Sequence, residues 1–123
     1  ELPPRDQYLL RSFIAATINA GSVTQLRIIA THFHHIDEDT NIRQLQTEAV
    51  LDFWDNTTHT VLLGDLNADP DDSEMEMLRQ GGFVDTVVAA GLTPAYTSTS
   101  DNPDRRIDYI WISSDLRVSS FTP

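Results

Sequence analysis

The sequence of 123 residues contains no cysteine and no lysine, and these two absences limit what the protein can do. Without cysteine there are no disulfides, no thiolate metal ligands and no thiol nucleophile, although the redox compartment stays open. All eight basic residues are arginine, against 19 acidic residues, so the formal net charge is −11. This balance argues against strong nonspecific binding to nucleic acid, which depends on neutralising phosphates.

Long hydrophobic runs are also missing. No stretch approaches the ~20 apolar residues that span a bilayer, and no signal peptide is recognisable. The first residue is Glu1 rather than Met. We therefore expect a processed or excised piece of a longer protein, and the sequence leaves its localisation open. The hydrophobic content of 40% is enough for the core of one small domain.

One stretch organises the rest of the chain. The apolar run at residues 61–63 predicts a buried strand that ends at Gly64, and Asp65 and Asn67 follow with Leu66 between them. Because alternate residues of an extended chain face the same way, we expect Asp65 and Asn67 to point together off the end of the strand. Sites in α/β layers are commonly built there. The alternative is that Gly-Asp-x-Asn is only turn chemistry.

The remaining patterns predict an α/β fold in which helices cover one face of a mixed sheet. We expect an extended entry over residues 1–7, strands at 8–18, 26–31, 60–64, 106–113 and 116–121, helices at 37–56, 73–81 and 84–90, and a loop at 93–104. The domain looks cut before a closing helix.

Two features of the predicted helices can be checked directly. The long helix has an apolar stripe that should face the core, with Asp39 or Thr40 capping its start. The short helix begins with a Ser-x-x-Glu capping box at residues 73–76. The stripe consists of Ile42, Leu45, Ala49, Val50 and Phe53.

Histidines follow the strand at 26–31. If the long helix is a crossover, this strand and the strand at 60–64 lie parallel, which brings His32 near Asp65. Histidine can donate to a phosphoryl oxygen or transfer a proton near neutral pH. The alternatives are an ordinary surface histidine and a zinc module built on His32, His34 and His35, although no ligand set with a diagnostic spacing accompanies them.

Asp108 lies inside an otherwise apolar predicted strand. A buried carboxylate needs a partner, which could be Arg105, Arg106, a backbone amide or a histidine. A structural Asp–Arg pair is one interpretation. The other is an acid that orients a catalytic imidazole.

Three motifs now stand in order: Thr31-His32, Gly64-Asp65-Leu66-Asn67 with Pro70, and Arg106-Ile107-Asp108-Tyr109-Ile110. Together they resemble the endonuclease/exonuclease/phosphatase superfamily, the deoxyribonuclease-like metal-dependent phosphoesterases. The resemblance covers roughly residues 11 to 121. It implies a four-layer α/β sandwich of two packed mixed sheets with helices outside, of which this chain is a part.

The resemblance also implies roles for individual residues. The superfamily hydrolyses a phosphodiester or phosphomonoester by in-line attack of an activated water. Asp65 matches the aspartate that activates or positions this water, and Asn67 matches the asparagine that stabilises the phosphorane. His32 matches the histidine that contacts the phosphate, and Asp108 the aspartate paired with an essential histidine. Arg106 matches an arginine to which we assign substrate binding.

The differences from the superfamily pattern predict an incomplete site. Residues 1–123 would form a single incomplete domain, the C-terminal half, so the metal ligands of the chain are unknown and the main ligand for Mg²⁺ or Mn²⁺ would lie outside it. We expect a phosphate-ester substrate for the parent protein and no activity from the chain alone. The half-domain would leave a sheet face exposed for self-association. The alternative function is a non-catalytic interaction or regulatory remnant of the same fold.

Overall fold

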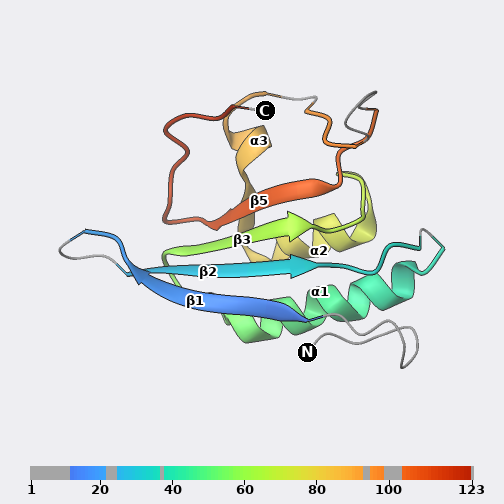
Figure 1. Ribbon diagram of the computed structural model, residues 1–123, viewed down its shortest axis with the longest axis horizontal. Coiled ribbons are helices and arrows are strands. Elements are labelled where there is room, and N and C mark those ends of the chain that lie inside the picture. The colour runs from blue at the N-terminus through green and yellow to red at the C-terminus, as the bar shows by residue number, and fades with distance from the viewer. Residues whose placement is uncertain (1–11, 22–24, 37, 93–94, 99–103, 123) are drawn as a thin grey trace.

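The computed structural model describes residues 12–21, 25–36, 38–92, 95–98 and 104–122. They form one five-stranded mixed sheet in the order β1-β2-β3-β5-β4, with helices packed against it (Figure 1). The elements in chain order are β1 (Phe13–Asn19), β2 (Gln25–His32), α1 (Thr40–Trp54), β3 (Thr60–Asp65), α2 (Ser73–Gly81), β4 (Phe83–Asp85), α3 (Thr86–Ala89) and β5 (Asp108–Ser113).

The strand directions bring three strand ends to one edge of the sheet. β1 and β2 form the predicted antiparallel hairpin, and α1 crosses over to β3, which runs parallel to β2. β5 inserts antiparallel between β3 and β4. The carboxyl ends of β2 and β3 therefore lie beside the start of β5, as the crossover prediction required.

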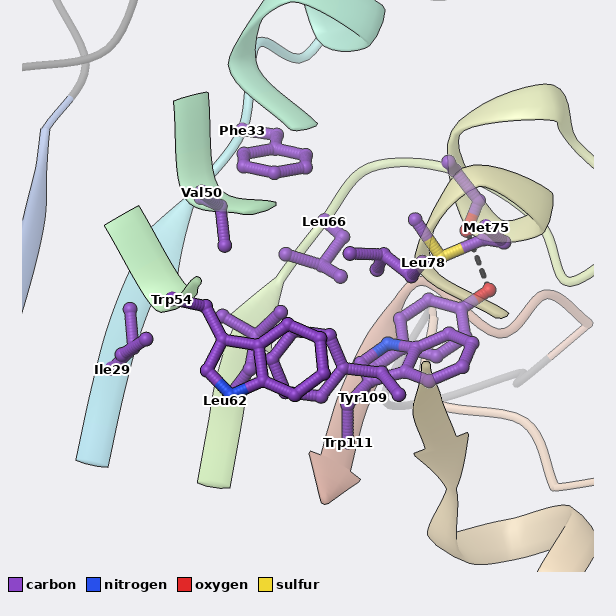
Figure 2. Close-up of a cluster of buried hydrophobic side chains, with 12 residues drawn as sticks. Ile29, Phe33, Val50, Trp54, Leu62, Leu66, Met75, Leu78, Tyr109 and Trp111 are labelled. Atoms are coloured by element: carbon purple, nitrogen blue, oxygen red, sulfur yellow. Dashed lines mark hydrogen bonds between the residues drawn. The ribbon is translucent and has the colours of Figure 1, made fainter. Parts of the chain in front are cut away.

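The core fills the space between one face of the sheet and the helices α1 and α2 (Figure 2). Leu62 and Trp111 of adjacent strands share this core with Val50 and Trp54 of α1, while Met75 and Leu78 come from α2. The fold is thus α/β, with a mixed sheet and helices on one face. No helix within the part of the chain that the structure describes is long and apolar enough to cross a membrane.

The opposite face of the sheet carries apolar rows that run across the strands. Ile14, Ala30, Leu63 and Ile110 are register partners on four consecutive strands. Of these, Ile14 is 74% exposed and Ile110 is 45% exposed. Val87 of α3, Tyr96 and Phe121 line a cavity together with Leu63 and Ile110, so this face is hollowed at that end and open at the Ile14 end.

The extents of α1 and α2 are close to those predicted, whereas the predictions for their buried face and their first residues need correction. The predicted stripe of α1 faces the core only in part: Val50 is fully buried and Ala49 packs against the core, whereas Leu45 and Phe53 are exposed. Asp39 is the residue before α1 but makes no capping bond. The capping box also fails, because α2 begins at Ser73 and its side chain bonds Glu74 and Gln44 instead. The predicted stop at residues 81–82 is confirmed.

Two strand predictions need correction. Residues 83–85 form β4, where helix was predicted from residue 84. Residues 116–121 form no strand, because the segment after β5 turns away without a ladder partner. The predicted entry over residues 1–7 and the first part of the strand predicted from residue 8 lie outside the described residues.

Gly64 allows the close approach of β2 and β3 just below the predicted site. Its φ is +144°, and a Cβ built on it would lie 1.9 Å from the carbonyl oxygen of Thr31. A side chain would therefore push the strands apart and strain the backbone. Position 64 therefore requires glycine, because any side chain there would collide with the backbone of Thr31.

Candidate active site

Three polar side chains form one row across three strands. The register pairs His32 with Asp65 and Asp65 with Asp108. His32 Nε2 lies 3.6 Å from Asp65 Oδ2, and the His32 side chain is 53% exposed. The row lies on the same face as the apolar rows, at the edge where the strand ends meet. The predicted convergence of these strand ends is confirmed, while the catalytic roles of the residues stay predictions.

Asp65 and Asp108 are close neighbours across β3 and β5. The N–H of Leu66 donates to the carbonyl of Ile107 at 2.8 Å, so the backbone bonds flank the Asp65–Asp108 pair. This makes it a non-hydrogen-bonded pair, the closer kind, with Cα atoms about 4.5 Å apart. Two carboxylates and an imidazole therefore face solvent side by side.

Asn67 lies at this site for a reason other than strand alternation. β3 ends at Asp65, and Asn67 has a left-handed φ of 50°. Its N–H donates to Asp65 Oδ1 at 3.0 Å, a local turn that short polar side chains favour. Its Nδ2 donates to the carbonyl of Phe33 at 2.8 Å. Asn67 thus ties the ends of β2 and β3 together and holds the Asp65 carboxylate.

The prediction that Asp108 is buried is wrong. Asp108 is the first residue of β5 and is exposed. The two candidate arginine partners bind other acids: Arg105 forms a fork with Asp69, and Arg106 forms one with Asp85. The strand has one open face, so alternation puts Asp108 in solvent and Tyr109 in the core.

Arg106 is the centre of a buried polar cluster beside the site. Its side chain is about 5% exposed and its guanidinium lies 4.4 Å from the centroid of the Tyr109 ring. The Tyr109 hydroxyl donates to the carbonyl of Ala68 at 2.7 Å (Figure 2). Burial raises the pKa of Tyr109, and the charge of Arg106 only partly opposes this. Substrate binding by Arg106 stays a prediction, and it would require the pair with Asp85 to open.

A cavity of about 340 Å³ opens beside the two carboxylates. Asp65 and Asp108 line it, together with apolar and aromatic side chains that include Val87, Tyr96 and Phe121. The two carboxylates are therefore accessible from a concave surface rather than from a flat one.

A profile of the endonuclease/exonuclease/phosphatase family matches residues 2–122. The chain belongs to the endonuclease/exonuclease/phosphatase family. No curated protein matches the chain at a significant level.

Solved structures support the same fold. An endonuclease/exonuclease/phosphatase from Beutenbergia cavernae superposes with a TM-score of 0.67 and 23% identity over 86% of this chain and 33% of that one. The human Nocturnin catalytic domain with bound sulfate superposes with a TM-score of 0.69 and 21% identity, over 92% of this chain and 46% of that one. Zebrafish (D. rerio) TDP2 with single-strand DNA product superposes with a TM-score of 0.66 and 18% identity, over 93% of this chain and 51% of that one. The chain thus spans about a third to a half of the length of these structures.

Members of the endonuclease/exonuclease/phosphatase family typically use divalent metal ions. Asp65 and Asp108 offer the carboxylate oxygens that Mg²⁺ and Mn²⁺ prefer. Within the described ranges, however, no group of three His, Cys, Asp or Glu side chains is placed to hold a metal. The donor set in this part of the chain is therefore partial.

The histidine cluster does not converge on one point. His32 faces Asp65 on the open side of the sheet, whereas His34 is fully buried. His34 Nε2 lies 2.8 Å from Asp39 Oδ2, and its backbone N–H donates to Gln46 Oε1. His34 therefore fixes the segment after β2 to α1, which does not fit a zinc module.

Sequence reasoning missed two residues that border the site. Asp85 was assigned to a helical turn, although an acid directly after Phe83 and Val84 could have indicated a buried ion pair. Thr97 was assigned to a polar loop, and its oxygen accepts the backbone N–H groups of Ile107 and Asp108 at 3.1 Å each. Nothing in the local sequence distinguishes this threonine from its neighbours.

Proposed function

We propose that this chain is part of a phosphoesterase that cleaves a phosphodiester or phosphomonoester by in-line attack of water. The observation that carries the proposal is the row of His32, Asp65 and Asp108 on three adjacent strands, with Asn67 bonded to Asp65. Packing does not require three ionisable side chains on an open face beside a cavity. Family membership supports the same chemistry.

Each residue of the row has a role in this proposal. Asp65 positions the attacking water and accepts its proton, because it is exposed enough to reach solvent and is held by the Asn67 N–H. Asn67 offers a neutral amide donor to the developing negative charge at phosphorus. His32 offers an imidazole donor to a phosphoryl oxygen, because its side chain is exposed and lies 3.6 Å from Asp65.

Asp108 and Arg106 act beside the reacting atoms. We propose that Asp108 orients an imidazole of the complete domain through a carboxylate–imidazole hydrogen bond, as the acid of a triad does. The sequence predicts that Arg106 binds substrate. Its pair with Asp85 favours a structural role beside β5, in which Arg106 holds β4 and β5 together.

The extent of the domain is also part of the proposal. Residues 1–123 would be the C-terminal half of a deoxyribonuclease-like four-layer sandwich; coverage of 33% and 46% of the first two structures supports a partial domain. The complete domain would bind Mg²⁺ or Mn²⁺ through a main ligand outside this chain. On their own, these residues should not turn over phosphoesters, because the described acids and histidines provide too few metal ligands.

The test uses the protein encoded by the complete reading frame. Hydrolysis of bis(p-nitrophenyl) phosphate and p-nitrophenyl phosphate is measured with Mg²⁺ or Mn²⁺ and after chelation. We expect metal-dependent turnover that Asp65→Ala abolishes and Asp115→Ala, an exposed aspartate at the far end of β3, leaves unchanged. Complete protein without turnover on either substrate would contradict the proposal and favour the interaction remnant. Strong turnover by residues 1–123 alone, lost on Asp65→Ala, would contradict only the proposed incompleteness.

The open sheet face supports a second proposal, self-association of the chain. The row formed by Ile14, Ala30, Leu63 and Ile110 contains no charged or polar side chain. Exposed apolar area of this kind marks association surfaces. A second copy of this chain presents the same uncharged face, so the two could cover each other.

A further inference from the structure

We propose that Thr97 is the residue that positions Asp108 in the row with Asp65 and His32. This inference rests on the proposed phosphoesterase function. Thr97 itself touches no reacting group in the proposal and acts through the backbone of β5.

The outer edge of β5 explains why Asp108 needs such support. β4 pairs with β5 only between Trp111 and Ser113, where Phe83 to Asp85 are the partners. Because Asp65 and Asp108 form a non-hydrogen-bonded pair on the β3 side, the Asp108 N–H points to the other side, beyond the end of β4. Without another partner, the first residue of β5 would be held on one side only.

Two threonine hydroxyls continue the edge where β4 stops. Thr86 Oγ1 donates to the carbonyl of Ile110 at 2.8 Å. One step further along, Thr97 Oγ1 accepts the N–H groups of Asp108 and Ile107 at 3.1 Å each. A hydroxyl oxygen has two lone pairs and can accept both bonds at once. The side chains thus replace a strand along the part of β5 that carries Asp108.

Thr97 is itself held in place. Its N–H donates to the carbonyl of Arg105 at 2.8 Å, and Ser98 and Arg105 form a bridge. Arg105 forms a fork with Asp69, in the loop after β3. The hydroxyl is therefore fixed relative to both β3 and β5, which is what a positioning residue requires.

The position of Asp108 should matter because its neighbours are already fixed. The Asn67 N–H holds Asp65, and Asp65 lies 3.6 Å from His32. Loss of the two bonds to Thr97 frees the first residues of β5 while those partners stay. A shift of about 1 Å in a reacting constellation can reduce the rate about a hundredfold.

The experiment measures kcat and KM of the protein encoded by the complete reading frame on the two p-nitrophenyl substrates. Thr97→Val keeps the shape but removes the acceptor, and Thr97→Ser keeps the acceptor. We expect kcat to fall about ten- to a hundredfold in Thr97→Val with KM little changed, and Thr97→Ser to stay near the wild type. Thr58→Val, a change at an exposed threonine beyond the other end of β3, should have no effect.

A double-mutant cycle tests whether Thr97 acts through Asp108. In an Asp108→Asn background, Thr97→Val should cause little further loss, because the group that it positions is already disabled. Additive losses, wild-type kcat in Thr97→Val, or equal losses in the Val and Ser variants would each overturn the inference while leaving the proposed function intact. Absence of turnover in the wild-type protein overturns the function and the inference together. If Thr97→Val fails to fold, the same cycle is run with Thr97→Ala.

Discussion

The buried side chain of Tyr109 should make the stability of the fold depend on pH in the alkaline range. Its ring is buried beside Arg106, and burial raises its pKa above the ordinary value near 10. The folded state then holds one more proton than the unfolded state above pH 10. We expect the free energy of unfolding to fall with rising pH there, by up to about 1.4 kcal/mol per pH unit.

Chemical unfolding between pH 8 and pH 11 checks this expectation. The absence of lysine and cysteine leaves tyrosine as the main side chain that titrates in this range. Tyr109→Phe should flatten the slope above pH 10, whereas Tyr96→Phe, at an exposed ring, should leave it unchanged. An unchanged slope in Tyr109→Phe would show that the buried phenol is not the cause.

At the scale of single residues, the sequence located the row and missed its supports. His32, Asp65 and Asp108 follow from strand order, because strand ends meet at one edge. The burial of Asp108 was misjudged, because Ile107 and Ile110 beside it suggested two buried faces. Asp85 and Thr97 were missed, because their partners lie 21 and 11 residues away and no local pattern encodes them.

At the scale of elements, α1 and α2 are joined by a buried ion pair. Arg43 Nε lies 3.2 Å from Glu74 Oε2, with side-chain exposures of 3% and 0%. Arg43 also donates to the carbonyl of Ile36, at the end of the segment after β2. The pair therefore holds two helices and the segment that follows His32 in one arrangement.

Glu74→Gln should destabilise the fold by about 3 kcal/mol, because it removes the carboxylate charge that is bonded to the buried Arg43 guanidinium. Urea unfolding provides the measurement, and Glu48→Gln at an exposed position of α1 is the matched control. Combined Arg43→Met and Glu74→Leu should recover much of the loss, since removing both charges also removes their desolvation cost. A single variant as stable as the control would contradict this account.

Buried polar residues explain why the predicted apolar stripe of α1 matches the core only in part. Arg43, Gln46 and Thr47 are buried, each with a polar partner. An analysis of hydrophobic periodicity places such polar residues on the solvent-facing side of a helix. The predicted buried face of α1 therefore differs from the observed one. Helix existence and length were predictable from the sequence, whereas the buried face depended on Glu74, 31 residues further along.

At the scale of the whole molecule, the order of elements was enough to predict a mixed sheet with helices on one face. The crossover through α1 fixed β2 and β3 as parallel, and the hairpin fixed β1. The short β4 was missed because three residues carry too little pattern. One face of the resulting sheet packs against α1 and α2. The opposite face is apolar and carries the row of His32, Asp65 and Asp108 at its edge.

That apolar face leads to the prediction of self-association. Light scattering on the purified chain should show a dimer or larger species that dissociates on dilution. Because each copy carries a net charge of −11, raising the salt concentration should screen the repulsion and strengthen the association. Ile14→Lys, on the open face, should shift the species toward monomer. Leu45→Lys, at an exposed apolar position on α1, should not. A monomer at all concentrations, or equal effects of the two substitutions, would show that the open face does not bind a second copy.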